Sequence, residues 1–158
     1  MPFVPTVLVA EDDPVFRRLL EFTLEKCGMN VVVASDGMLA YERFLEGGID
    51  LLVTDHQMPR ASGIELLENI LANESIPSPR SILCTAKGLE LDTDALMQQF
   101  GLLAIMHKPF SPRKLSELLQ SEAATLSAEI IPTEPSDSPQ VSRPGFPFGG
   151  ISGGHASV

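Results

Sequence analysis

The residues of this chain that could do chemistry stand directly after short apolar runs. In chain order, residues 7–10 are followed by Glu11, Asp12 and Asp13, residues 49–54 by Asp55, residues 81–84 by Thr85, and residues 102–106, one residue later, by Lys108 and Pro109. If these runs are parallel strands of one sheet, their carboxyl ends meet at the crevice where open α/β sheets bind ligands. Several carboxylates, a hydroxyl and an ammonium would then share one pocket. Such a pocket suits a divalent cation and a phosphoryl group.

The spacing of apolar residues predicts alternating strands and helices. Strands are predicted at residues 6–10, 30–34, 49–54, 81–84 and 102–106. Helices are predicted from Pro14 up to Gly28, from Gly37 up to Gly47, over residues 64–71 and 89–100, and from Pro112 to about Ala124. This is the (βα)5 order of a doubly wound parallel sheet, an α/β fold.

Composition limits the function classes. The chain has 158 residues, enough for one domain of ordinary size, and 44% of them are hydrophobic, as in a folded globular protein. The formal net charge of -10 argues against direct binding of nucleic acid, which needs a basic surface. No apolar run approaches the roughly 18–20 residues of a membrane span, and the first residues lack a signal-peptide pattern. We therefore expect a cytoplasmic protein without direct contact to nucleic acid or membrane.

The two cysteines, Cys27 and Cys84, lie far apart in the sequence and belong to no CxxC or Cys/His cluster. This spacing favours two small core side chains in a reducing compartment over a disulfide or a zinc site.

The composition changes at about Thr125, where the chain becomes rich in proline, glycine and serine and loses its apolar periodicity. We therefore expect one domain over residues 1–124 and a disordered tail over residues 125–158. The composition favours a solvated tail, and the alternative is a motif around Phe146 and Phe148 that binds a partner protein.

Five motifs stand in order after the expected strands. They are the acidic cluster at 11–13, Asp55, Met58-Pro59 with Ser62-Gly63, Thr85-Ala86, and Lys108-Pro109. Together they resemble the receiver domain of bacterial two-component response regulators, over about residues 6–124. The resemblance implies a flavodoxin-like fold, with a five-stranded parallel sheet of strand order 2-1-3-4-5 and a ligand crevice between the first and third strands.

The resemblance also implies a role for each acidic residue. Asp55 would be the phosphoacceptor, and its carboxylate would attack the phosphorus of a phosphohistidine donor. Asp12 and Asp55 would bind Mg²⁺ (or Mn²⁺) directly, Glu11 would bind it through water, and Gln57 would contribute its main-chain carbonyl. Without a cation these crowded carboxylates repel one another, so at least one pKa should rise.

The phosphoryl group itself would be held by residues after the fourth and fifth strands. Lys108 would pair with Asp55 before transfer and with a phosphoryl oxygen after it. The Thr85 hydroxyl and the main-chain amide of Ala86 would donate hydrogen bonds to the phosphoryl group. The peptide bond before Pro109 is cis in the family, and we expect the same here.

Plainer explanations exist for several of these residues. Asp13, which precedes Pro14, is predicted to be a helix cap rather than a metal ligand. His56 is interpreted as a loop side chain. Taken alone, Glu11 and Asp12 could be a solvated loop face, Asp55 a turn aspartate, Thr85 a strand-end residue and Lys108 a surface charge.

The sequence departs from the family pattern at Ile105, where receivers often carry Tyr or Phe. Phosphorylation should be intact, but the route by which the signal reaches the surface of residues 89–124 stays open. No output domain is recognised after Ala124. The resemblance thus predicts a single-domain regulator rather than an enzyme. It would be phosphorylated by a histidine kinase or phosphotransfer protein, and it would signal through a downstream protein or through a homodimer across that surface.

Two other functions stay open. A magnesium-dependent phosphohydrolase with an aspartate nucleophile would carry DxDx[TV] after the first strand, and the residues from Glu11 to Pro14 do not fit that motif. A degenerate receiver that binds partners irrespective of phosphate is favoured by Ile105. The complete acidic site and Lys108 count against it.

Overall fold

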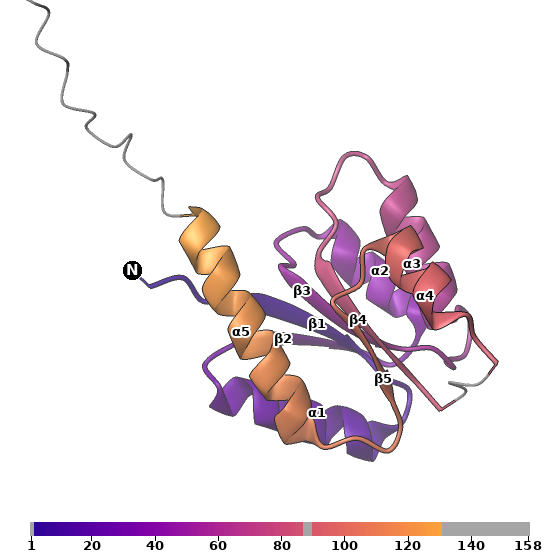
Figure 1. Ribbon diagram of the computed structural model, residues 1–158, viewed down its shortest axis with the longest axis horizontal. Coiled ribbons are helices and arrows are strands. Elements are labelled where there is room, and N and C mark those ends of the chain that lie inside the picture. Colours follow the sequence, from indigo (N-terminus) through magenta and orange to yellow (C-terminus); the bar gives the residue numbers. More distant parts are fainter. Residues whose placement is uncertain (1, 87–89, 131–158) are drawn as a thin grey trace, which may run out of the picture.

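Five parallel strands alternate with five helices along the chain (Figure 1). The structure is a computed structural model that describes residues 2–86 and 90–130. The elements are β1 (Thr6–Ala10), α1 (Pro14–Lys26), β2 (Asn30–Ala34), α2 (Gly37–Leu45), β3 (Leu51–Asp55), α3 (Gly63–Ala72), β4 (Arg80–Thr85), α4 (Thr93–Phe100), β5 (Ala104–His107) and α5 (Pro112–Ile130). The strands form one sheet in the order β2-β1-β3-β4-β5. The flavodoxin-like fold predicted from the sequence is confirmed.

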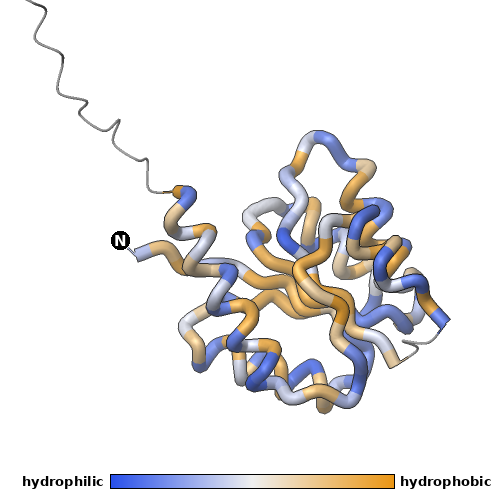
Figure 2. Tube along the Cα trace, viewed as in Figure 1, coloured by the Kyte–Doolittle hydropathy of each residue, from blue (hydrophilic) through white to orange (hydrophobic). Residues whose placement is uncertain are grey.

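The sheet is buried on both faces. Helices α1 and α5 cover one face, and α2, α3 and α4 cover the other (Figure 1). Alternate residues of β1 serve the two layers: Val7 and Val9 pack with α1 and α5, and Leu8 and Ala10 pack with α2 and α3. Burial on both sides explains why the strands are unbroken apolar runs, which form the orange centre of Figure 2.

Aspartate caps begin the helices on either side of β2. The Asp13 side chain accepts a hydrogen bond from the amide of Val15 at 2.9 Å, and Asp36 accepts one from the amide of Leu39 at 2.8 Å. Because Pro14 has no amide hydrogen, the first turn of α1 loses nothing by carrying it. The cap role predicted for Asp13 is confirmed.

The third and fourth strands each run one residue further than predicted. Asp55 and Thr85 are the last residues of β3 and β4, not the first residues after them. The ladder pairs Asp55 with Cys84, so Thr85 stands one position beyond the neighbour of Asp55. Both side chains are therefore fixed by the sheet and not by a loop.

The prediction that the fifth strand begins at residue 102 was wrong. Gly101 ends α4 in the left-handed conformation with φ 60. The amide of Leu102 then bonds back to the carbonyl of Met97 at 3.1 Å, so the chain becomes extended only at Ala104. The start of α4 also differs from the predicted residue 89, which lies outside the described residues. The helix begins at Thr93, after the cap residue Asp92.

The last helix extends past its predicted end at Ala124 and continues to Ile130. Arg80, at the start of β4, forms ion pairs with Glu122 and with Glu129, the latter at 2.7 Å. These contacts hold the last turns of α5 against the sheet. The prediction of disorder was therefore wrong for residues 125–130, and the rest of the predicted tail, with Phe146 and Phe148, lies outside the described residues.

Two other predictions from composition can be compared with the structure. Over the described ranges, no helix combines the length and apolar character required to cross a bilayer. Both cysteines are free thiols, Cys84 buried and Cys27 half-buried. Burial raises the pKa of the Cys84 thiol to about 12, so it is an inert core side chain.

Two glycines let the loop after β3 pack closely against its neighbours. A Cβ atom at Gly63 would lie 2.3 Å from the carbonyl oxygen of Asp55. A Cβ atom at Gly37 would lie 2.2 Å from the carbonyl oxygen of Ala61, which belongs to the same loop. The backbone around the end of β3 therefore has no room for a side chain at either position.

We expect Gly63→Ala to lower the free energy of unfolding by about 2–3 kcal/mol, because the added methyl group meets backbone that cannot move without shifting β3. Urea denaturation measures the loss. The control is Gly48→Ala, where φ is 79 and no atom lies within 4 Å of the added Cβ. That variant should lose only about 1–2 kcal/mol from left-handed strain. A smaller loss at Gly63 than at Gly48 would contradict the packing argument.

Candidate metal and phosphoryl site

The carboxyl ends of the strands bring the predicted acidic residues together. Carboxylate oxygens of Glu11, Asp12 and Asp55 all lie within 4.8 Å of one another. Glu11 and Asp55 are buried, and Asp12 is exposed. Two buried carboxylates with a third at the mouth form an oxygen-only donor set, which is the kind that hard divalent cations prefer.

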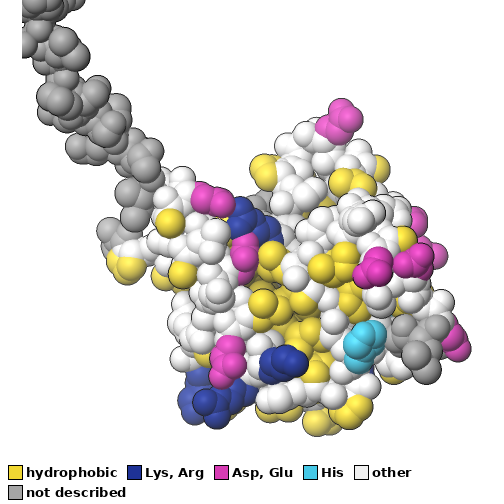
Figure 3. Space-filling view, viewed as in Figure 1, with side chains coloured by type: hydrophobic (Ala, Val, Ile, Leu, Met, Phe, Trp, Pro, Cys, Tyr) yellow, Lys and Arg dark blue, Asp and Glu magenta, His cyan; other side chains and the backbone are white. Residues whose placement is uncertain are grey.

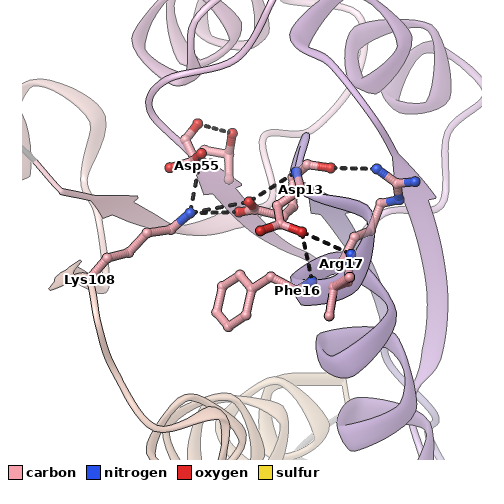
Figure 4. A network of polar contacts seen from close by, with 8 residues as sticks. Asp13, Phe16, Arg17, Asp55 and Lys108 are labelled. Carbon is pink, nitrogen blue, oxygen red and sulfur yellow. Dashed lines mark hydrogen bonds and ion pairs between the residues drawn. The ribbon is translucent and has the colours of Figure 1, made fainter.

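Lys108 places its ammonium between the two buried carboxylates (Figure 4). Its Nζ lies 3.0 and 3.2 Å from the two carboxylate oxygens of Glu11 and 3.3 Å from Oδ2 of Asp55. The sequence predicted the contact with Asp55 but not the shorter one with Glu11. The signal was available, because Glu11 is the first residue after the central strand β1.

Burial and repulsion shift the ionisation of this group. Burial raises the pKa of Glu11 and of Asp55, and the neighbouring carboxylates add to the rise, which Lys108 only partly offsets. Burial alone would lower the pKa of Lys108, but its hydrogen bond to Glu11 and the charge of Asp55 outweigh burial, so this pKa is raised. The predicted rise of at least one carboxylate pKa is confirmed.

The group opens into a pocket with a volume of ≈ 530 Å³, which is the size of a small-ligand site. Its lining residues are Glu11, Asp12, Asp13, Phe16, Ala86, Lys108, Pro109 and Phe110. The peptide bond between Lys108 and Pro109 is cis, as predicted.

The other predicted phosphoryl and metal ligands lie on the same edge of the sheet. Thr85 is buried at the end of β4, and its carbonyl accepts a hydrogen bond from the amide of Lys108 at 2.9 Å. Ala86 follows it and lines the pocket, and Gln57 is exposed two residues after Asp55. The roles of the Thr85 hydroxyl, the Ala86 amide and the Gln57 carbonyl stay predictions.

Main-chain contacts fix the orientation of Glu11. Arg17 Nη1 donates to the carbonyl oxygen of Glu11 at 2.9 Å, and the amide of Asp13 donates to Oε1 of Glu11 at 3.3 Å (Figure 4). Sequence reasoning did not single out Arg17. His56, interpreted as a loop side chain, is half-buried, and its amide donates to the carbonyl of Cys84 at 2.8 Å.

An ion pair that the sequence did not reveal holds the loop after β3. Arg60 is in the left-handed conformation with φ 69, which is unfavourable for a residue with a side chain. Its Nη2 and Nε donate to Oδ2 of Asp36 at 2.6 and 3.0 Å. Because Asp36 also caps α2, this ion pair joins the loop that follows Asp55 to the start of α2.

With the geometry in place, the chain can be compared with known proteins. The family model described as the response regulator receiver domain matches residues 7–120. The chain therefore belongs to the response regulator receiver domain family, the signalling module of two-component systems.

Curated relatives are similar over most of this chain. The transcriptional regulatory protein CpxR of Escherichia coli (strain K12) is 38% identical over 109 residues, which is 69% of this chain and 45% of that protein. The alkaline phosphatase synthesis transcriptional regulatory protein PhoP of Bacillus subtilis (strain 168) is 34% identical over 129 residues, 78% of this chain and 52% of that protein. The chain thus spans about half the length of these curated relatives.

Solved structures agree on the fold. The response regulator receiver domain protein (CheY-like) from Methanospirillum hungatei JF-1 has a TM-score of 0.70 at 24% identity, covering 80% of this chain and 99% of that one. The chemotaxis response regulator CheY4 of Vibrio cholerae has a TM-score of 0.67 at 23% identity, covering 75% and 98%. At these identities the likeness supports the fold alone.

We expect Asp55→Asn to raise the melting temperature of the metal-free protein by a few degrees at pH 7. The pKa of Asp55 is higher in the folded protein than in the unfolded chain, so the unfolded chain releases this proton at lower pH. The free energy of unfolding therefore falls as pH rises from the ordinary pKa of 3.8 through the pKa of the folded state. An uncharged isostere removes that penalty. Thermal unfolding with a chelator measures the gain, which should vanish below the unfolded pKa. A lower melting temperature at pH 7 would contradict the expectation.

We expect Asp36→Asn to lower the melting temperature at pH 7, because asparagine still caps α2 but loses the charge that holds Arg60. Burial alone would raise the pKa of Asp36, but the hydrogen bonds from Arg60 and from the Leu39 amide outweigh it and the pKa is lowered. The stabilisation is thus present above the ordinary value of 3.8 and is lost as pH falls through the folded pKa. Thermal unfolding of both proteins from pH 7 down to pH 3 tests this. A difference that does not shrink over this range would contradict a charge effect.

Proposed function

We propose that this chain is a phosphorylatable switch, in which Asp55 accepts a phosphoryl group from a phosphohistidine on a histidine kinase or phosphotransfer protein. The observation that carries the proposal is the position of the Lys108 ammonium, which contacts Glu11 and Asp55 across a sequence separation of up to 97 residues. An anionic nucleophile, a cation that can accept its charge and an open pocket are the parts that phosphoryl transfer needs.

Magnesium dependence is part of the proposal. Glu11, Asp12 and Asp55 would hold Mg²⁺ (or Mn²⁺), with the main-chain carbonyl of Gln57 as a further ligand. The fit rests on the oxygen-only donor set and on the raised carboxylate pKa values, since a site with excess negative charge favours a cation. When bound, the ion would neutralise charge between the carboxylates and the incoming phosphoryl group.

The chain's own residues would carry the transfer. A carboxylate oxygen of Asp55 attacks the phosphorus, and the new O–P bond forms as the P–N bond to the donor imidazole breaks. The imidazole nitrogen keeps the electron pair of the broken bond. Lys108, 3.3 Å from Asp55, then pairs with a phosphoryl oxygen. The Thr85 hydroxyl and the Ala86 amide donate hydrogen bonds to the same group.

Output by protein contact completes the proposal. A groove of ≈ 590 Å³ lies along β5 and the start of α5 and includes Ile105, Met106, Lys114 and Leu118 in its lining. Figure 3 shows hydrophobic side chains gathered on this face, beside β5. We assign this groove, together with the neighbouring surface of α4, to a downstream protein or to a second copy of the chain. Ile105 supplies an aliphatic side chain in the groove where many receivers supply an aromatic one.

The proposal places the protein in the cytoplasm, in keeping with its two free thiols. The curated relatives named above are transcriptional regulators, but the net charge of -10 argues against direct binding of this chain to DNA. We therefore assign it contact with proteins and no direct contact with nucleic acid.

We expect acetyl phosphate with Mg²⁺ to add one phosphoryl group to the wild-type protein, and we expect Asp55→Asn or a chelator to abolish the addition. Intact-mass spectrometry measures it. The matched control is Asp50→Asn, which changes the residue just before β3, at the opposite end of the strand from Asp55. There, Oδ2 of Asp50 accepts a hydrogen bond from the amide of Thr6 at 2.8 Å. This control should be phosphorylated like the wild type.

Failure of the wild-type protein to take up phosphate from any donor would overturn the proposal and favour a module that binds partners irrespective of phosphate. Steady turnover of small phosphate esters would instead favour a phosphohydrolase.

A further inference from the structure

The two carboxylate partners of Lys108 are not enough to hold its ammonium in one position. Lysine carries its charge on a flexible four-carbon chain, and 24% of this side chain is exposed. One of these partners, Asp55, would change its charge and shape when it is phosphorylated. A contact that does not depend on Asp55 would keep the ammonium over the pocket in both states.

The ring of Phe16 provides such a contact. Nζ of Lys108 lies 5.1 Å from the centroid of this ring, within the distance at which the face of an aromatic ring attracts a cation. Figure 4 shows the ring beside the lysine side chain, on the first turn of α1. The amide of Phe16 also donates to the cap residue Asp13 at 3.3 Å, so the ring stands on the same rigid helix start that follows the acidic cluster.

Phe110 supports the ring of Phe16 from the segment after β5, which carries the lysine. The two ring centroids are 5.4 Å apart with an interplanar angle of 73°, an edge-to-face contact. Phe110 lies two residues after Lys108, so the ring pair joins α1 to the segment that presents the ammonium. Both rings are half-buried, pack against the core of α1 and α5, and line the pocket beside Lys108.

We infer that Phe16 is a positioning residue for phosphoryl transfer, which holds the Lys108 ammonium over the pocket through its ring face. The expected change in the rate of phosphoryl addition rests on the proposed function, whereas the contact between Lys108 and Phe16 rests on geometry alone. Ordinary core packing would need only an apolar side chain at this position. Positioning needs an aromatic ring.

The test compares Phe16→Leu, which stays apolar but loses the ring, with Phe16→Tyr, which keeps it. The initial rate of phosphoryl addition from acetyl phosphate with Mg²⁺, measured by intact mass, should fall about five-fold in the leucine variant, the equivalent of about 1 kcal/mol. The tyrosine variant should recover most of the wild-type rate. Thermal unfolding of each variant separates a change of rate from a loss of fold.

The chain offers a matched control on the same helix. Phe22 lies 5.3 Å beneath the Nζ of Lys26 on the exposed side of α1, so Phe22→Leu removes a similar contact away from the pocket. This variant should add phosphoryl groups at the wild-type rate. Equal rates for wild type and Phe16→Leu, or no recovery with tyrosine, would overturn the inference. A wild-type protein that takes up no phosphate would overturn the proposed function instead.

A second readout needs neither phosphate nor metal. In NMR spectra of the metal-free wild-type protein, the ε-methylene protons of Lys108 should resonate upfield of those of exposed lysines, because the adjacent Nζ lies over the ring. The shift should persist in Phe16→Tyr. It should be absent in Phe16→Leu, and if that variant does not fold, the wild-type spectrum still decides. An unshifted Lys108 resonance in the wild type would overturn the inference.

Discussion

The pairing of one ammonium with two buried carboxylates is the interaction on which this site depends. Glu11 and Asp55 sit at the ends of adjacent central strands, and a pair of like charges so placed would be strongly unfavourable without a nearby cation. Lys108, the residue after β5, supplies that cation, but it does not cancel the whole charge, since both carboxylate pKa values stay raised. The metal-free fold is thus left with excess negative charge at the mouth of the pocket, beside the exposed Asp12.

The sheet explains why this arrangement is stable enough to exist. β3 is buried along its whole length and pairs on both sides, so Asp55 cannot turn away from its neighbours without breaking the ladder. The loop that follows is confined by Gly63, which packs against the Asp55 carbonyl, and by the ion pair of Arg60 with Asp36. Charge repulsion within the site is therefore opposed by backbone hydrogen bonds and close packing, which act on every residue of the strand.

The alternation of strands and helices and the members of the acidic group could be predicted from local signals in the sequence, whereas the strand order came from the resemblance to receiver domains. Apolar runs mark the strands, Asp13 before Pro14 marks a helix start, and parallel strands must end on one edge. The contacts that could not be predicted join residues far apart in sequence through single side chains. Arg60 reaches Asp36 from an unfavourable φ, and Arg80 retains the last turns of α5 through Glu122 and Glu129. No spacing rule indicates which charged residue on one element will face which residue on another.

The residues next to Lys108 also connect the pocket beside the carboxylates to the groove along β5. The lysine follows β5 directly, and its amide is held by the carbonyl of Thr85 at 2.9 Å. Pro109 and Phe110, the next two residues, line both the pocket beside Lys108 and the groove along β5. In the proposed transfer, a shift of the ammonium from Glu11 and Asp55 toward a phosphoryl oxygen would therefore act on a segment that also lines the groove. Such a coupling would need no aromatic side chain at position 105, because it would run through the backbone of residues 108–110 and the ring of Phe110.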